Sequence, residues 1–203
     1  MAKSLDDARA ELRARQGAGA RYDSAGAPAR ELDWARRGTS YFARILNGLR
    51  DDEFDQPSLI PGLSRRYVIT YIGYQARLFG ETIGWARSHP KGRLPFVIRL
   101  DDEEIRDHLT LPVRALRYLF EHSAIHLDVE WRDCSDADWN ACPSDHSGRI
   151  IELRKTPWLR AAAIWLHALD LNSGGRLKDM PAELLSRPSS ERPGRSSRGL
   201  VGL

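Results

Sequence analysis

The segment TPWLRAAAIWLHALDLNSGG, residues 156–175, is the most informative stretch of this chain. Apolar side chains recur along it at spacings of three and four residues, the pattern of a helix with a buried stripe. Thr156 followed by Pro157 predicts a helix start, with Thr156 as the cap and proline at the first helical position. His167 lies on the apolar stripe, and Ala163 occupies the position one turn before it. The segment therefore predicts a buried helix with a single histidine near its centre.

Three further helical segments are predicted before this one. Residues 31–50 carry apolar side chains along one continuous stripe, with arginines outside it. Residues 51–62 contain two prolines and a glycine, which indicates a loop. Ser64 is a suitable N-cap for a second helix over residues 64–88.

A third helical segment begins at the acidic run 101–104, because carboxylates stabilise a helix N-terminus. Pro112 is expected to break this segment, which continues over residues 113–133. Residues 148–154, GRIIELR, are a candidate for a short strand. Four amphipathic helices joined by long connections predict an all-α protein, a four-helix bundle with crossover connections.

The chain divides into three parts. Residues 1–28 form an N-terminal helix or arm, residues 29–186 form the helical bundle, and residues 187–203 form a tail rich in arginine, serine and proline. Such a tail buries too little apolar surface to fold, so disorder is expected. The tail also carries the whole net charge of +3, since it holds four arginines and one glutamate.

Composition excludes several classes of protein. The remaining body is formally neutral and offers no basic face for a nucleic acid. No run of about 18 apolar residues is present, so a membrane span is excluded. The N-terminus lacks the apolar core of a secretion signal, which indicates a cytoplasmic protein. In that compartment Cys134 and Cys142, the only cysteines, are expected to be free thiols.

Four side chains are candidates for binding a substrate. Tyr67, Tyr71 and His167 project from predicted core-facing positions of two helices, and Arg160 opens the helix that carries His167. An arginine can hold a carboxylate through two parallel hydrogen bonds. A zinc site needs at least three protein ligands, and Ala163 offers none at the natural partner position of His167. A core histidine that is bonded to a neighbour is the alternative interpretation of His167.

A weaker metal candidate is the pair His122 and His126, since residues four apart lie on the same face of a helix. No third ligand is identifiable beside them, so the same spacing also suits a half-exposed helix face. No nucleophile elbow, phosphate-binding loop or dinucleotide fingerprint occurs in the chain.

Five ordered stretches together resemble the mycothiol-dependent maleylpyruvate isomerase family, which has the DinB-like four-helix bundle fold. They are GARYDSAGAP (19–28), ARRGTSYFARILNGL (35–49), PSLIPGLSRRYVITYIGYQAR (57–77), LPVRALRYLFEHSAIHLDVEWRD (111–133) and TPWLRAAAIWLHALDLNSGG (156–175). The resemblance implies a divalent metal, usually zinc, and a low-molecular-weight thiol that isomerises maleylpyruvate to fumarylpyruvate. The metal would lower the pKa of the thiol. Longer members carry a second, C-terminal domain, which this chain is expected to lack.

The resemblance also implies where the metal ligands would fall. The histidine of the second helix falls at Tyr71, a nearby family histidine at Tyr67, and the glutamate of the fourth helix at Ala163. Only the last ligand is kept, as His167. Because function depends on the site and not on the fold, the metal site is expected to be impaired.

Three hypotheses follow for function. The chain is an isomerase or thiol transferase that recruits metal through other groups, such as His122 and His126. Alternatively it is a metal-free bundle that binds a small acidic metabolite beside Tyr67, Tyr71 and His167. The third hypothesis is an inactive, truncated relative with a structural role as a homodimer.

Overall fold

The computed structural model describes residues 22–96, 100 and 102–186, and within this part of the chain all regular structure is helical. The helices are α2 (Ala29–Gly48), α3 (Arg65–Ser88), α4 (Asp102–Asp107), α5 (Val113–Asp133), α6 (Thr156–Asp170) and α7 (Ala182–Ser186). Short 3-10 turns lie at Asp51–Glu53, Asp138–Asn140, Leu153–Lys155 and Leu177–Asp179. The predicted all-α class is therefore confirmed. The predicted arm and tail fall largely outside the described residues.

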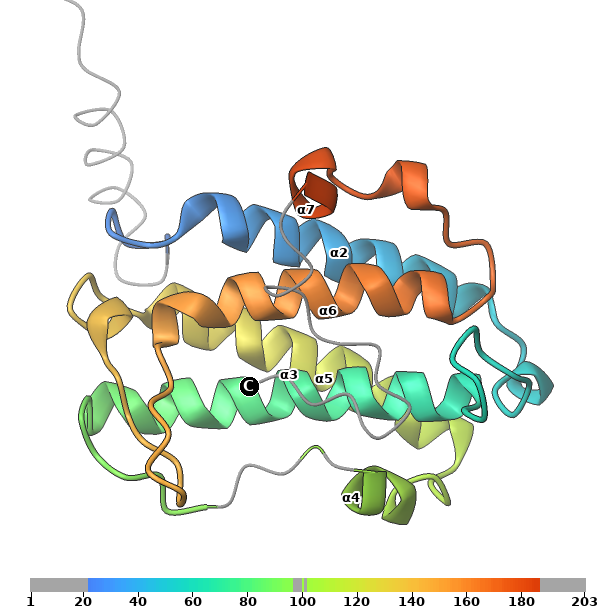
Figure 1. Ribbon diagram of the computed structural model, residues 1–203, viewed down its shortest axis with the longest axis horizontal. Helices are drawn as coiled ribbons and strands as arrows, with labels where there is room; N and C mark the ends of the chain where they lie inside the picture. The colour runs from blue at the N-terminus through green and yellow to red at the C-terminus, as the bar shows by residue number, and fades with distance from the viewer. Residues whose placement is uncertain (1–21, 97–99, 101, 187–203) are drawn as a thin grey trace, which may run out of the picture.

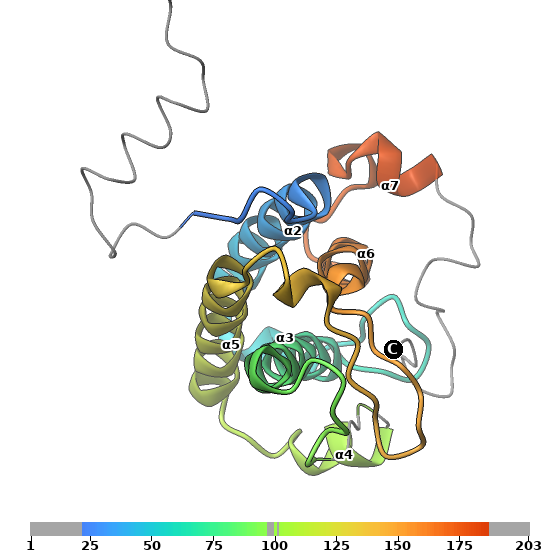
Figure 2. The same cartoon turned by 90° about the vertical axis from the view of Figure 1, so that its left-hand side faces the viewer.

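Helices α2, α3, α5 and α6 form the bundle (Figures 1 and 2). Helix α2 packs beside α6, and α3 packs beside α5. The two members of each pair run in the same direction, and the pairs run in opposite directions (Figure 1). The connection from α3 to α5 must therefore cross the length of the bundle, and it carries α4 on its way. This is the bundle with crossovers that the helical pattern predicted.

Glycines bring α3 and α5 close together. The side chain of Leu119 closes over Gly73, and that of His126 closes over Gly80. An added Cβ would lie 2.9 Å from the nearest side-chain atom at either glycine. In both contacts the α5 residue lies the same number of positions after its glycine in α3, so the two helices run parallel in a fixed register.

Three local predictions concern helix starts and the loop before α6. The Ser64 side chain accepts a hydrogen bond from the backbone N–H of Tyr67 at 3.3 Å, which confirms the predicted N-cap of α3. Thr156 lies inside α6 and donates to the carbonyl of Leu153 at 2.7 Å, so the prediction that it caps the helix is wrong. The predicted strand at 148–154 is also wrong, because this stretch forms one isolated bridge and then a 3-10 turn.

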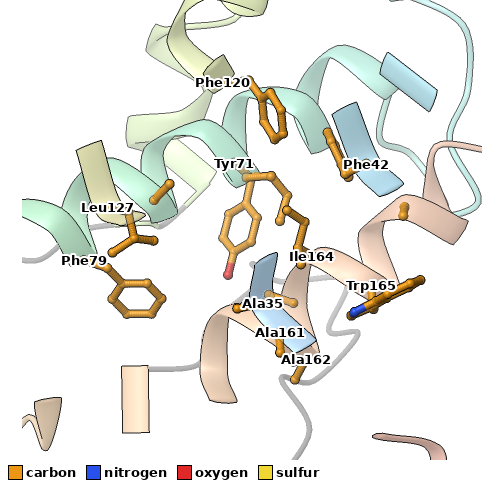
Figure 3. Packing of buried hydrophobic residues seen from close by; sticks show 14 of the residues in the cluster. Ala35, Phe42, Tyr71, Phe79, Phe120, Leu127, Ala161, Ala162, Ile164 and Trp165 are labelled. Carbon is orange, nitrogen blue, oxygen red and sulfur yellow. The ribbon is translucent and has the colours of Figure 1, made fainter. Parts of the chain in front are cut away.

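The core fills the space between the four helices with aromatic and aliphatic side chains (Figure 3). Phe42 of α2 stacks on Phe120 of α5 with ring centroids 5.1 Å apart. The indole N–H of Trp165 donates to the carbonyl of Trp34 at 2.9 Å and ties α6 to α2. Across the described ranges, none of the helices combines the length and apolar character that a membrane span requires.

Candidate ligand-binding site

Helix α6 places three charged or titratable side chains in the interior, Arg160, His167 and Asp170. Arg160 and His167 are separated by two helical turns and therefore share a face of the helix. They are 1% and 2% exposed, respectively. His167 Nδ1 lies 2.8 Å from an oxygen of Asp170, which is itself fully buried. This bond fixes the orientation of the imidazole ring.

Tyr71 of α3 faces this end of the interior. Its ring meets the His167 ring edge-on, with centroids 5.3 Å apart, and Figure 3 shows it pointing from α3 toward α6. Burial raises the pKa of Tyr71 to about 12, so the phenol is neutral at physiological pH. Tyr67, one turn earlier, and Ala163 are also buried. The structure thus brings Tyr71 and His167 together, as the family mapping requires.

The residues at the positions that the resemblance assigns to metal ligands do not fit a zinc ion. Tyr71 is a protonated phenol, Ala163 has no donor atom, and His167 supplies one imidazole where at least three ligands are needed. Throughout the described part of the chain, no three His, Cys, Asp or Glu side chains are grouped so that they could hold a metal ion.

The second candidate pair, His122 and His126, does not form such a group either. His122 is exposed and stacks on Tyr118, with centroids 5.5 Å apart. His126 lies 3.4 Å from Glu130 at a half-exposed position of α5. Each imidazole therefore has a separate neighbour on the surface of the helix.

Arg160 is the most unusual group in the interior. One nitrogen, Nη1, donates to the backbone carbonyl of Ile72 at 2.7 Å and to the side-chain oxygen of Gln75 at 3.1 Å. Its other two nitrogens, Nε and Nη2, are buried without a hydrogen-bond partner among the described residues. Burial lowers the pKa of Arg160 to about 9. Buried cations are normally paired, and no carboxylate of the described residues lies within ion-pair distance of this one.

Arg65 shows how a buried arginine is normally satisfied in this fold. Its Nε and Nη2 donate to the carbonyls of Leu171 and Asn172 at 2.7 and 2.8 Å. Its Nη1 donates to the side-chain oxygen of Gln56 at 2.9 Å. Arg65 therefore closes the C-terminal end of α6, whereas Arg160 keeps an unused pair of donors.

A pocket of about 260 Å³ leads from the surface between α2 and α5 to Arg160. Its lining residues come from three helices and are Arg36, Thr39, Ser40, Ala124, Ile125, Leu127, Asp128, Trp131, Arg132 and Arg160. Arg160 is its sole contribution from α6 and forms the floor. Tyr71 and His167 are not part of this lining.

An ion-pair cluster bridges the helices at the pocket. Arg36 of α2 donates through Nε to Asp128 of α5 at 2.7 Å and through its two terminal nitrogens to Asp23 at 2.6 and 2.7 Å. Arg132 lies 3.4 Å from the other oxygen of Asp128. The charges of this cluster therefore largely compensate one another, and the charge of Arg160 does not enter the cluster.

Of the residues that line the pocket, only Arg160 is among the binding residues predicted from the sequence. Arg36, Thr39, Ser40 and Asp128 resemble the ordinary solvated faces of amphipathic helices, because periodicity shows which face is polar and not what that face meets. The one feature of the sequence that indicated this pocket was Arg160, a charged residue on the apolar stripe of its helix, two turns before a core histidine.

Comparison with known proteins agrees with this fold. Residues 35–172 match the family described as the mycothiol maleylpyruvate isomerase N-terminal domain. The structure is similar to two crystal structures of the mycothiol-dependent maleylpyruvate isomerase, one of them a histidine-to-alanine mutant, with TM-scores of 0.69 and 0.70 and 33% identity. Each match covers 77% of this chain and 65% of the solved chain, so this chain spans about two thirds of that enzyme. Curated protein sequences gave no match. The chain belongs to the mycothiol maleylpyruvate isomerase N-terminal domain family.

Proposed function

We propose that this chain binds a small organic acid inside the bundle and that binding needs no metal ion. The observation that carries the proposal is the buried Arg160 guanidinium, which has two unused donors and no acidic partner in the described residues. An uncompensated charge in the interior is unfavourable. A ligand carboxylate would supply both the missing charge and the missing acceptors.

Metal-assisted isomerisation has less support at this site. The reaction that the relatives' name describes depends on mycothiol, and a metal would assist by lowering the pKa of the thiol. Here Tyr71 and Ala163 stand where two of the metal ligands would be needed, and they do not fit the ion. We therefore assign no catalytic step to these residues.

Thermal unfolding in the presence of organic acids tests the proposal. Protein treated with EDTA and dialysed should melt at a higher temperature when benzoate, pyruvate or maleate is added, and at least one acid should give a saturable rise. A ligand at about 100 times its Kd stabilises a protein by about 2.7 kcal/mol. If no acid shifts the melting temperature, the chain does not bind acids. If a shift occurs only after zinc is added, the metal-independent part of the proposal is wrong.

A designed metal site tests the assignment of the ligand positions. The double variant Tyr71→His, Ala163→Glu should bind one zinc ion per chain together with His167, because this set supplies three ligands. The wild-type protein and either single variant are the matched controls and should bind far less than one. A double variant that keeps its helical spectrum but takes up no zinc would show that the ligand positions are assigned wrongly.

A further inference from the structure

We infer that the acid is a monocarboxylate with an apolar body, that it enters between α2 and α5, and that its carboxylate binds Nε and Nη2 of Arg160. The inference rests on the proposed function and adds the place, the orientation and the chemical class of the ligand.

The guanidinium of Arg160 is oriented for such a ligand. Nε and Nη2 lie on one edge of the planar group, and this edge can donate two parallel hydrogen bonds to the two oxygens of one carboxylate. The group is held in place through Nη1, which donates to Ile72 and Gln75 of α3. The unused edge is separate from Nη1, so a carboxylate bound there leaves the hydrogen bonds to Ile72 and Gln75 in place.

The walls of the pocket favour a ligand with an apolar body. Ala124, Leu127 and Trp131 of α5 supply hydrophobic surface, and Thr39 and Ser40 of α2 supply neutral hydroxyls. A volume of about 260 Å³ suits a ligand the size of a single substituted ring. A carboxylate at the floor would leave the rest of the ligand against these side chains.

Charge in the pocket selects one carboxylate over two. Arg36 already donates to Asp23 and Asp128, and Arg132 also lies beside Asp128. Arg160 is therefore the only lining cation with no acidic neighbour in the described structure. A second carboxylate on the ligand would lie beside Asp128, Arg36 and Arg132, where both cations are already paired, so it would lose water without gaining a free cation.

The ion pair between Arg36 and Asp128 lies at the more exposed end of the pocket. It joins α2 to α5 at 2.7 Å, and both side chains are 35% exposed. Arg160 beneath it is 1% exposed, so a ligand reaches the floor only when the lining side chains move apart.

Calorimetric titration of the full chain with three related probes tests the inference. Benzoate is the apolar monocarboxylate, benzamide is its neutral counterpart, and phthalate carries a second carboxylate. We expect benzoate to bind at least tenfold more tightly than either of the others. Equal affinity for benzoate and benzamide would overturn the role of the charge, and tighter binding of phthalate would overturn the charge selection.

Variants locate the binding site. Arg160→Met should weaken benzoate binding at least tenfold, and Ala124→Phe should do the same by filling the pocket. Ala115→Phe is the matched control, since it makes the same change at a half-buried position of α5 outside the lining, and it should bind benzoate normally. If Arg160→Met does not fold, the two alanine variants decide the question.

The outcomes separate this inference from the proposed function. Benzoate binding that survives both Arg160→Met and Ala124→Phe would place the acid elsewhere, so the site would be wrong and the acid-binding function would stand. Binding of no acid at all would reject both. Asp128→Asn should reduce the preference for benzoate over phthalate, and an unchanged preference would show that Asp128 does not select the ligand.

Discussion

Replacement of Arg160 by methionine should make the ligand-free protein more stable. The guanidinium stays protonated at neutral pH, so its lowered pKa expresses the free energy of burying the charge. The fall of the Arg160 pKa from its ordinary value to about 9 corresponds to about 5 kcal/mol, at about 1.4 kcal/mol for each tenfold change in proton affinity. Methionine has a similar length and no charge, and it avoids this cost.

The variant also loses two hydrogen bonds, those from Nη1 to Ile72 and Gln75. Bonds of this kind contribute about 1 to 1.5 kcal/mol each. The net gain should therefore be about 2 to 3 kcal/mol, within the range of about 1 to 4 kcal/mol seen when buried ions are replaced by apolar groups. In a chain of 203 residues this raises the melting temperature by about 5 to 10 °C.

Urea denaturation between pH 6 and 8 measures the difference. For a cation with a lowered folded-state pKa, the destabilisation is fully present below that pKa and is relieved only as the pH rises through it. The advantage of Arg160→Met should therefore be constant over this range. Arg65→Met is the matched control and should lose about 3 kcal/mol, because it removes satisfied hydrogen bonds from a charged group. A loss of stability in Arg160→Met similar to that control would show that Arg160 has a partner, and the reasoning would fail.

Two further predictions concern packing and thiol reactivity. Gly38→Ala should lower the free energy of unfolding by about 1 to 3 kcal/mol, because the new Cβ would lie 2.6 Å from an Ile164 methyl carbon. The control Gly48→Ala has no atom within 4 Å of the new Cβ and should be neutral or stabilise the protein by up to about 1 kcal/mol. Equal effects of the two substitutions in urea denaturation would contradict the close packing at Gly38. At pH 8 a thiol reagent should label Cys142 and leave Cys134 unmodified, because burial raises the pKa of Cys134 to about 12. Rapid labelling of the Cys142→Ser variant would show that Cys134 is reactive and would contradict this prediction.

The helices of this protein could be predicted from local pattern. The apolar stripes, the Ser64 cap and the break at Pro112 located α3 and α5 within a residue or two, because such signals act over one or two turns. The strand predicted at 148–154 was wrong because a strand forms only where a second segment pairs with it, and local sequence does not show that partner. In the structure this stretch makes a single bridge, between Ser144 and Ile150.

The candidate site also has a part that could be predicted from the sequence and a part that only the tertiary structure decides. The family resemblance assigns two metal-ligand positions to Tyr71 and Ala163. Given that assignment, residue identity predicts that His167 lacks those ligands, since a phenol and a methyl group have the same chemistry wherever they lie. The packing of α6 against α2 and α3 decided that Arg160 is buried without an acid, and that Arg36 and Asp128 meet above it. Those facts depend on distances between residues far apart in the chain, and periodicity along a single helix carries no information about them.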